Sequence, residues 1–318
     1  MINRRNFLKN SSMMAAGGLL AGSVNVANAA TSSVSGANAA KNIGLQIYSL
    51  TVGGDQEFVK DVAGGLKKVA AMGYATLELA GYNDGKVGAV PIRDFNKMAQ
   101  DAGLKIVSTH VNPPVNMYSP RNIEQIKEFW KKAAADHAAI GCKYLIQPGQ
   151  PQTRNTEDIK MICEVFNEAG KIAKAAGLIW GYHNHDGEFA TVIPGGMEGF
   201  TGRRRPSTPG AQIIYDGYLE GTDPELVQFE MDVYWTVMGQ KDPVDYMKKH
   251  ANRIRVLHIK DEKVLGESGM MNFQKIYETA YANGIQDFFV ELENYPEGTQ
   301  MEGVKGCADY LLKASFVK

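Results

Sequence analysis

The sequence predicts an α/β protein made of a single (β/α)₈ barrel, a TIM barrel, with an insertion after the fifth strand. Eight short β-rich segments alternate with amphipathic helical segments, and glycines follow several of the helices. A polar residue also stands near the end of almost every β-rich segment. The rival fold is an open doubly wound sheet, but no GxGxxG motif follows the first strand, where a nucleotide-binding sheet would carry one.

The N-terminal residues are expected to act as a signal rather than as part of the barrel. Arg4 and Arg5 come before Phe7-Leu8, a weakly apolar run at 13–26 and the small residues Ala27-Asn28-Ala29. This order is typical of a twin-arginine export signal. We therefore expect a signal at 1–29, a linker at 30–41, a TIM-barrel catalytic domain at 42–318, and a periplasmic location.

Composition argues against several classes of partner. With 34 basic and 35 acidic residues the formal net charge is -1, which favours neither nucleic acid nor an anionic membrane surface. No later segment approaches the roughly 20 apolar residues of a membrane span. A homo-oligomer is compatible with the sequence. The three cysteines Cys142, Cys163 and Cys307 lack CxxC spacing, so we expect them to be buried apolar residues.

The β-rich segments set the order of the expected strands. They cover 43–49, 75–79, 105–110, 144–148, 179–185, 227–233, 255–260 and 288–293. Helical periodicity marks 58–72, 122–140, 158–176 and 273–283. We expect these glycines to end helices: Gly73, Gly103, Gly141, Gly177 and Gly284.

The longest connection follows the fifth strand. Its Gly-, Pro- and Arg-rich part at 195–210 is expected to be a mobile loop over the barrel mouth. Within it, Arg203-Arg204-Arg205 is expected to be solvated.

Polar residues inside the strands predict where the site lies. In strand order, those near the C-terminal ends are Gln46, Glu78, His110, Gln147, His183, Asp232, His258 and Glu291. Period-two alternation adds four residues on the same face: His185, Glu230, Lys260 and Glu293. In a (β/α)₈ barrel that end forms the active-site mouth. Buried polar residues are costly without partners or a metal, so their convergence predicts a functional site.

Several of these residues also have a structural interpretation. Gln46 and Gln147 could bond loop backbones instead of substrate, and Glu78 could cap a helix. His137 and His250 are expected at the surface. Among the aromatic residues, Trp235 is expected to stack against a sugar ring, with Tyr48 and Tyr182 as weaker candidates.

The densest motif is Tyr-His-Asn-His-Asp-Gly-Glu-Phe at 182–189, where two histidines two apart on a strand point the same way. Further motifs are Thr-Asp-Pro-Glu-Leu-Val at 222–227, Glu-Met-Asp-Val-Tyr-Trp at 230–235, His-Ile-Lys-Asp at 258–261 and Val-Glu-Leu-Glu at 290–293. With these motifs the sequence resembles the xylose isomerase-like family of TIM-barrel sugar (phosphate) isomerases and epimerases. That family also includes inosose dehydratases, tagatose-type epimerases and endonuclease IV.

The resemblance implies one divalent metal ion, held by residues that end strands five to eight and are usually Glu, Asp, His and Glu. The matching positions here are His183, Asp232, His258 and Glu291. Imidazole and carboxylate ligands suit manganese, cobalt, zinc or iron better than calcium. Histidine in place of the usual glutamate on strand five casts doubt on a symmetrical two-carboxylate epimerisation. His185 is the alternative ligand, or a general base.

The predicted function is that of a metal-dependent isomerase or epimerase acting on a non-phosphorylated sugar or keto-sugar, by proton abstraction next to a carbonyl. The expected catalytic residues are Glu291, His185, Lys260 and Glu293. The expected substrate-binding residues are Gln46, Glu78, His110, Gln147, Glu230 and Trp235.

Three alternatives remain. One is a lyase or dehydratase that performs β-elimination on a keto-sugar, keto-glycoside or inosose. Another is a non-catalytic carbohydrate-binding barrel. The third is DNA repair, which six histidines and near-zero charge make a poor match.

Overall fold

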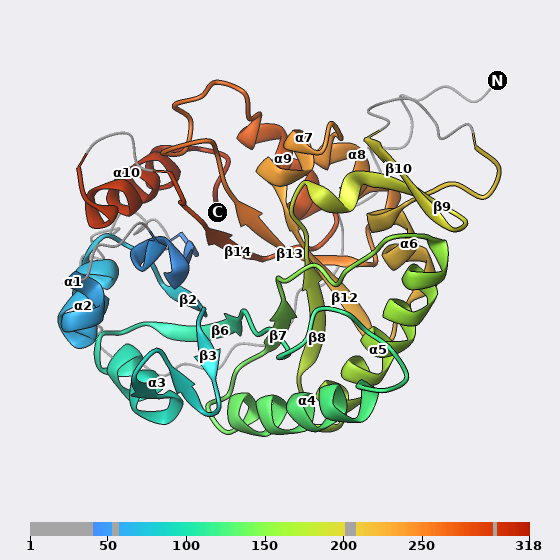
Figure 1. Cartoon of the computed structure of the whole chain (residues 1–318). Helices are drawn as coiled ribbons and strands as arrows, with labels where there is room; N and C mark the ends of the chain where they lie inside the picture. The colour runs from blue at the N-terminus through green and yellow to red at the C-terminus, as the bar shows by residue number, and fades with distance from the viewer. Residues whose placement is uncertain (1–40, 53–56, 201–207, 295–297) are drawn as a thin grey trace, which may run out of the picture. The chain divides into compact units, whose positions relative to one another are not determined.

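The computed structural model describes residues 41–52, 57–200, 208–294 and 298–318. The predicted export signal (1–29) and nearly all of the predicted linker (30–41) lie outside this range, as does Arg203-Arg204-Arg205. The described residues form a parallel eight-stranded sheet surrounded by helices (Figure 1). Its strands are β1 (Gly44–Gln46), β2 (Thr76–Leu79), β6 (Lys105–Thr109), β7 (Tyr144–Gln147), β8 (Ile179–His183), β12 (Val227–Asp232), β13 (Ile254–Ile259) and β14 (Asp287–Val290).

The sheet curls until its two edge strands meet. Its order is β6-β2-β1-β14-β13-β12-β8-β7, and β6 meets β7 through a parallel bridge between His110 and Ile146. Beside this bridge Lys143 N donates to Val107 O, and Val111 N donates to Ile146 O. The predicted TIM barrel is therefore confirmed, and the open doubly wound sheet is wrong.

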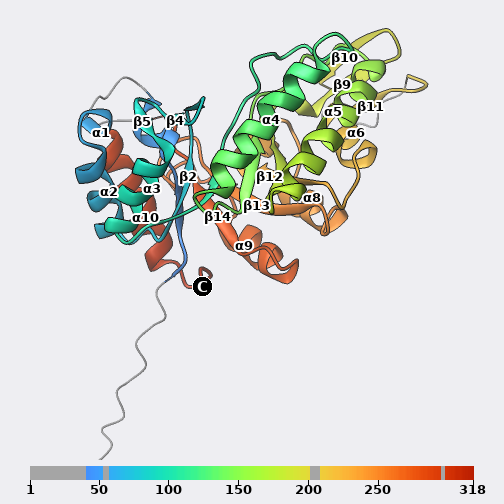
Figure 2. The same cartoon turned by 90° about the horizontal axis from the view of Figure 1, so that it is seen from below.

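The helices form the outer wall. They are α1 (Glu57–Lys60), α2 (Val62–Ala71), α3 (Ile92–Asp101), α4 (Ile123–Ala138), α5 (Thr156–Ala175), α6 (Ile214–Gly221), α7 (Val233–Met238), α8 (Pro243–Lys249), α9 (Phe273–Ala282) and α10 (Gln300–Lys313). Seen from below, α4 and α5 lie side by side along one flank (Figure 2). None of the described helices has both the length and the apolarity needed to cross a bilayer.

Glycine ends several helices as predicted. Gly73, Gly103, Gly141, Gly177 and Gly284 all have positive φ, between 72° and 98°. Since side chains make this conformation costly, glycine lets the chain leave each helix and enter the next strand.

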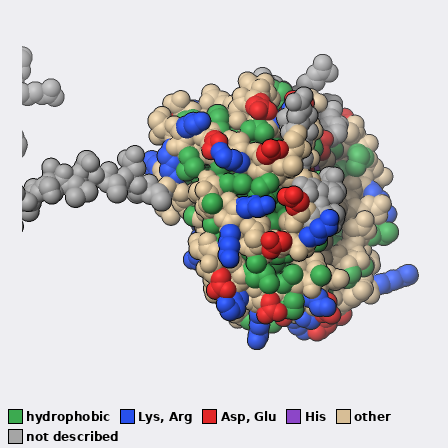
Figure 3. Space-filling model, turned by 90° about the vertical axis from the view of Figure 1, so that its left-hand side faces the viewer, with side chains coloured by type: hydrophobic (Ala, Val, Ile, Leu, Met, Phe, Trp, Pro, Cys, Tyr) green, Lys and Arg blue, Asp and Glu red, His purple; other side chains and the backbone are tan. Residues whose placement is uncertain are grey.

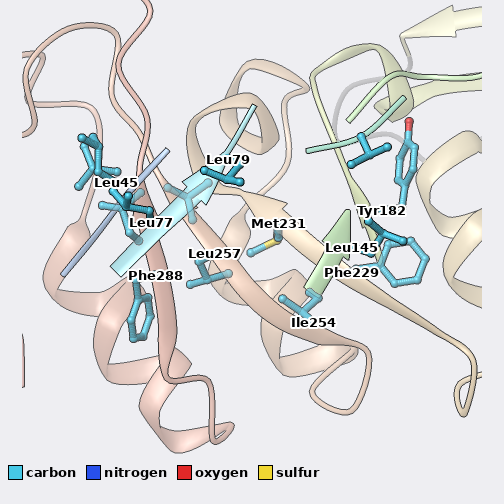
Figure 4. Packing of buried hydrophobic residues seen from close by; sticks show 14 of the residues in the cluster. Leu45, Leu77, Leu79, Leu145, Tyr182, Phe229, Met231, Ile254, Leu257 and Phe288 are labelled. Carbon is cyan, nitrogen blue, oxygen red and sulfur yellow. The ribbon is translucent and has the colours of Figure 1, made fainter. Parts of the chain in front are cut away.

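Strand alternation divides the apolar residues between two packing layers. Residues facing the helices include Leu45, Leu77, Phe229, Met231 and Leu257, which belong to the main core (Figure 4). A separate small cluster consists of Val107, Tyr144, Ile146, Val256 and Phe289. Because these residues alternate with helix-facing ones along their strands, we place them inside the barrel, below the polar strand ends.

Several strands end earlier than predicted because their last polar residues turn into loops. β1 ends at Gln46, where a 3-10 helix, η1 (Ile47–Leu50), begins, and the Gln46 side chain accepts from Tyr48 N. β8 ends at His183 rather than at His185, and β14 ends at Val290 rather than at Glu293.

The connection after β8 differs from the predicted loop. β9 (Ala190–Ile193) pairs antiparallel with both β10 (Gly196–Phe200) and β11 (Gln212–Ile213). The turn between β9 and β10 is Pro194-Gly195, with φ of 77° at Gly195. Thus 196–200 is a strand, because β-branched residues in β9 and a Pro-Gly turn favour a hairpin. A second small sheet, β3 (Tyr82–Asn83), β4 (Lys86–Val87) and β5 (Val90–Pro91), was not predicted.

The prediction that His137 lies at the surface is wrong. It is fully buried on α4, where its Nδ1 lies 2.6 Å from Ala133 O and its ring packs on Tyr82. The position follows Ile126, Trp130 and Ala133 at helical spacing, so it belongs to the buried stripe of the helix. His250 is half-buried near the end of α8.

Burial of His137 predicts an acid-sensitive contribution to stability. Burial lowers the pKa of His137 from 6.5 to about 4, so the folded chain resists protonation that the unfolded chain accepts. This contribution is therefore present above pH 6.5 and is lost as the pH falls toward 4. Between pH 7 and pH 5, wild type should lose about 2 kcal/mol more unfolding free energy than His137→Gln. Urea unfolding of metal-free protein at both pH values measures this, and equal losses in the two proteins would contradict it.

Candidate active site

Strand register brings the predicted polar residues together inside one end of the barrel. Gln46 pairs with Glu78, and Glu78 pairs with Ser108. On the other side Glu230 pairs with His183, and Asp232 pairs with His258. Paired residues on parallel strands face the same way, so these side chains share the barrel interior.

Four of them form a compact group of potential metal donors. His183, Asp232, His258 and Glu291 each offer an atom within 4.8 Å of the others, and all four are buried. They come from the ends of β8, β12 and β13 and from the residue after β14. This is the set that the family resemblance implies.

Three donor atoms of the group lack hydrogen-bond partners: Asp232 Oδ2, His258 Nδ1 and Glu291 Oε2. His258 Nδ1 lies 3.4 Å from Glu291 Oε2 and 3.9 Å from Asp232 Oδ2. Polar atoms without hydrogen bonds are costly in a protein interior, and here three of them face one another, with Lys260 Nζ 3.6 Å from Glu291 Oε2. Mixed nitrogen and carboxylate donors fit a divalent transition metal.

Local structure explains why one oxygen of Asp232 is free. Asp232 is the N-cap of α7, and its Oδ1 accepts from Trp235 N at 2.8 Å. Thr236 Oγ1 donates to Asp232 O, which fixes the backbone at the strand end. The helix cap therefore uses Oδ1, and Oδ2 is left free to point toward the other potential metal ligands.

A second polar group lies against the first. Glu78 Oε2 is 2.5 Å from His258 Nε2, and Glu230 Oε2 is 2.7 Å from His110 Nε2 and 3.2 Å from His183 Nδ1. His110, His183, Glu230 and His258 also offer donor atoms within 4.8 Å of one another. The two groups share His183 and His258.

The protein itself offsets only part of the charge in this interior: although burial opposes it, His258 and Lys260 lower the pKa of Glu291, and His110 and His258 lower that of Glu78. Burial raises the pKa of Asp232 to about 7, and burial together with Glu78 does the same for Glu230. Burial opposes a charge on His258, but Glu230 and Glu78 outweigh it and raise its pKa. The buried carboxyl groups Glu78, Glu230, Asp232 and Glu291 have Lys260 as their one lysine neighbour among the described residues. A divalent cation would stabilise the ionised forms of Asp232 and Glu230, whose ionisation burial opposes.

A cavity of about 340 Å³ opens at this end of the barrel. It is lined by Tyr48, Ala80, Gly81, His110, Asn112, Pro148, Gly149, His183, His185, Glu291 and Glu293. A larger cavity of about 450 Å³ lies at the opposite end, where strands begin, and contains none of the predicted site residues.

The other predicted catalytic residues lie beside the cavity. Lys260 Nζ is 2.7 Å from Glu293 and 3.6 Å from Glu291, and it lies over the Trp235 ring. The His185 ring is half-buried near the rings of His183 and Trp235. Burial lowers the pKa of His185 to about 4, so its imidazole is neutral at pH 7.

Among the predicted substrate-binding residues, His110 lines the cavity and the others do not. Gln46 and Glu78 are fully buried and bond each other at 2.7 Å. Gln147 accepts from Tyr118 and donates to Gly149 O, which is the loop-bonding interpretation. Glu230 is fully buried.

The aromatic candidates also differ. Tyr48 lines the cavity and is 40% exposed, whereas Trp235 is half-buried beside it. Tyr182 is fully buried against Phe166, because it lies on the helix-facing side of β8. Tyr48 is therefore the aromatic side chain best placed to meet a substrate.

Sequence reasoning missed three supporting residues. Ser108 Oγ donates to Glu78 Oε1 at 2.6 Å. Asn184 is buried, and its Oδ1 accepts from Asp232 N. Glu188 accepts from Tyr182 OH and from His185 N, which fixes the turn after β8. The presence of Asn184 and Glu188 in the motif at 182–189 was the available signal, and their spacing did not show these partners.

Comparisons with known proteins agree with the barrel fold. A family model described as a xylose isomerase-like TIM barrel matches residues 66–310. A sugar phosphate isomerase/epimerase from Parabacteroides distasonis is 53% identical over 87% of this chain and 100% of that chain, with a TM-score of 0.80. A second one from the same organism is 44% identical over 91% and 99% of the two chains, with a TM-score of 0.81.

Similarity to curated proteins is more local. An inosose dehydratase from Salmonella agona is 28% identical over 102 residues, which are 32% of this chain and 28% of that protein. The chain therefore spans less than a third of the length of this relative.

The donor geometry predicts that the barrel takes up a divalent ion. Demetallated wild type reconstituted with Mn²⁺ or Co²⁺ should retain about one ion per chain, and His258→Ala should retain almost none, because a ligand is lost and carboxylates are left facing one another. Elemental analysis after desalting measures the ratio, and circular dichroism checks the fold.

His250→Ala is the matched control, because this histidine lies outside the two donor groups. It should bind as wild type does. The prediction fails if wild type retains no ion, or if His258→Ala retains as much as wild type.

Proposed function

Because this chain belongs to the xylose isomerase-like TIM barrel family, we propose that it is a divalent-metal-dependent isomerase or epimerase acting on a sugar or keto-sugar. One observation carries the proposal. The unpaired buried atoms of Asp232, His258 and Glu291 lie beside a cavity whose wall includes His185 and Glu293. The site thus combines donors for a cation with side chains able to move a proton.

His183, Asp232, His258 and Glu291 would hold the ion, which we propose to be manganese, cobalt, zinc or iron. When bound, such an ion supplies a positive charge that polarises a sugar carbonyl and makes the neighbouring C–H more acidic. The donors come from separate strands of a closed barrel, so their positions are fixed before a substrate arrives.

The protein's own residues would carry the proton. His185 and Glu293 line the cavity from the ends of β8 and β14, strands that are separated by β12 and β13 in the sheet. One of them would remove the proton from the carbon next to the carbonyl and leave an enediolate. Returning a proton to the neighbouring carbon completes an isomerisation, and returning it to the opposite face completes an epimerisation.

Lys260 would act on the oxygen side of the reaction. Its ammonium group contacts Glu293 and Glu291 and is almost fully buried, so its position is restrained. Donation of a hydrogen bond from Lys260 Nζ would stabilise negative charge on a substrate oxygen.

Elimination is a second candidate function, supported by the local similarity to inosose dehydratase. The same base would remove the same proton. A hydroxyl group on the next carbon would then leave as water after accepting a proton from an acid. Lys260, whose ammonium group is ion-paired with Glu293, would supply that proton.

We propose a non-phosphorylated substrate. The described residues that line the cavity include Glu291 and Glu293 but neither lysine nor arginine, and the nearby Lys260 is already ion-paired with both of these carboxylates. A phosphate group would meet carboxylates there without the bidentate arginine contacts that favour it. Elsewhere, basic and acidic side chains are interspersed on the face seen in Figure 3 rather than gathered by sign.

We also propose export through the twin-arginine route to the periplasm, supported by Arg4 and Arg5 ahead of an apolar run. Replacing both with lysine should leave the full-length chain in the cytoplasm, because the paired arginines are the recognised feature. Cell fractionation followed by mass measurement of the N-terminus tests this, with Lys9→Arg as control. Equal export of the double variant would contradict it.

Hydrogen exchange tests the chemistry. In D₂O, Mn²⁺-loaded wild type should incorporate deuterium next to the carbonyl of an accepted neutral sugar or keto-sugar, detected by NMR. His185→Ala or Glu293→Gln should slow exchange about 10²- to 10⁴-fold, because a proton-transferring group is lost. His250→Ala should exchange as wild type does.

A panel that pairs each sugar with its phosphate ester tests the substrate class. If sugars bind but none exchanges or reacts with loaded wild type, the non-catalytic carbohydrate-binding barrel replaces the enzyme. A new alkene signal accompanied by loss of hydroxyl identifies elimination.

A further inference from the structure

Both histidines of the proposed metal group touch a carboxylate with one ring nitrogen. His258 Nε2 lies 2.5 Å from Glu78 Oε2, and His183 Nδ1 lies 3.2 Å from Glu230 Oε2. An imidazole has two nitrogens, and a neutral ring carries its hydrogen on one of them. If each carboxylate accepts a hydrogen bond from the N–H of its imidazole, Nδ1 of His258 and Nε2 of His183 keep their lone pairs and can bind a metal ion.

The nitrogen left over on His258 faces the other unpaired donors. His258 Nδ1 has no hydrogen-bond partner and lies nearest Glu291 Oε2 and Asp232 Oδ2, which have none either. On the opposite side of the ring, Nε2 lies 2.5 Å from Glu78 Oε2 and 3.3 Å from Glu230 Oε2, so Glu78 is its nearer partner. The His258 ring therefore lies between Glu78 on one side and the proposed metal ligands Asp232 and Glu291 on the other.

Four side chains contact Glu78 and fix its position, one of them His110, whose Nε2 lies 3.2 Å from Oε2. Gln46 Nε2 donates to Oε2 at 2.7 Å, Ser108 Oγ donates to Oε1 at 2.6 Å, and His258 Nε2 approaches Oε2. The direction of the Gln46 amide is itself determined, because its Oε1 accepts from Tyr48 N. Glu78 is fully buried, so it can neither rotate nor reach a substrate.

Glu230, on the other side, is held through one oxygen, because its Oε1 has no hydrogen-bond partner. Its Cα pairs with that of His183 across neighbouring strands, and His110 Nε2 lies 2.7 Å from its Oε2. Glu230 is also fully buried, and it does not line the cavity. Its accessible partners are the imidazoles beside it.

A rival arrangement places an ion among His110, His183, Glu230 and His258, whose donor atoms are equally close. Ions in both groups would force His183 and His258 to give up both nitrogens as bridging imidazolates. An ion in this group alone would require His258 Nε2 in place of its contact with Glu78. It would also leave two buried oxygens, Asp232 Oδ2 and Glu291 Oε2, without hydrogen bonds, whereas an ion in the first group leaves one, Glu230 Oε1. With a single ion in the first group, His183 and His258 each use one ring nitrogen for the ion and the other for a carboxylate.

We infer that Glu78 and Glu230 are positioning residues that select the metal-binding nitrogens, Nδ1 of His258 and Nε2 of His183. The inference rests on the ion site of the proposed function and assigns these two carboxylates to the histidines instead of to substrate. A carboxylate that accepts the far N–H of a metal-binding histidine fixes the ring and makes it a stronger donor.

A crystal structure of Co²⁺-loaded wild type tests the assignment directly. It should show the ion on His258 Nδ1 and His183 Nε2, with Glu78 and Glu230 on the opposite nitrogens. An ion on His258 Nε2, or one bound by Glu230 and His110, would overturn the inference.

Substitution gives a second, independent measurement. Glu78→Gln and Glu230→Gln should each weaken Co²⁺ binding about 10- to 100-fold. The visible Co²⁺ spectrum should change in both, because ring orientation and donor strength change. The matched control is Glu188→Gln, which alters a buried carboxylate that bonds Tyr182 and the His185 backbone but no imidazole. It should keep the wild-type affinity and spectrum.

The outcomes separate this inference from the proposed function. Wild-type affinity and spectrum in Glu78→Gln and Glu230→Gln, or equal changes in Glu188→Gln, would contradict the positioning role even in an active enzyme. Binding through the assigned nitrogens without turnover on any sugar would support the inference while rejecting the proposed reaction. Thermal melting of metal-free variants shows whether each one folds.

Discussion

Closure of the barrel is the constraint on which the site depends. Once β6 meets β7, the inward side chains are enclosed by the wall of strands and must find most of their partners among one another. Val107, Tyr144, Ile146, Val256 and Phe289 meet this requirement by packing on one another. Above them, carboxylates and imidazoles meet it by pairing, and the pairing is incomplete where Asp232, His258 and Glu291 converge. The apolar layer thus supports a polar layer beside a cavity that Glu291 and His183 line.

The unpaired atoms result from local structure as much as from the barrel. Asp232 gives one oxygen to the first turn of α7, and His258 has one nitrogen against Glu78. Each residue is therefore held by one end and free at the other. Side chains held in this way lose little entropy on binding a ligand, which favours affinity and geometric selectivity. Gln46 is held at both ends of its amide: Oε1 accepts from Tyr48 N in η1, and Nε2 donates to Glu78.

The sequence predicted the strands and the inward-facing set well, because period two, helix-capping glycines and polar residues at strand ends are local signals. It did not predict partners. Gln147 alternates with the inward Ile146 and so belongs to the other face, where it bonds Tyr118. Glu78 and Glu230 were correctly placed inside, but their depth depends on the register between strands, including an irregularity between Leu77 and Glu78. His137 follows a recognisable apolar stripe, so its burial could have been predicted.

The contact between β6 and β7 has a consequence for how the molecule comes apart. His110 forms the backbone bridge to Ile146 at this seam, and its side chain reaches across the interior to Glu230. The edge where the sheet closes is thereby tied to strands on the far wall through charged contacts rather than through a long ladder. Any local opening of the seam would carry an imidazole away from the centre of the polar layer. In this barrel, a residue at the seam that closes the sheet also belongs to the polar layer of the site.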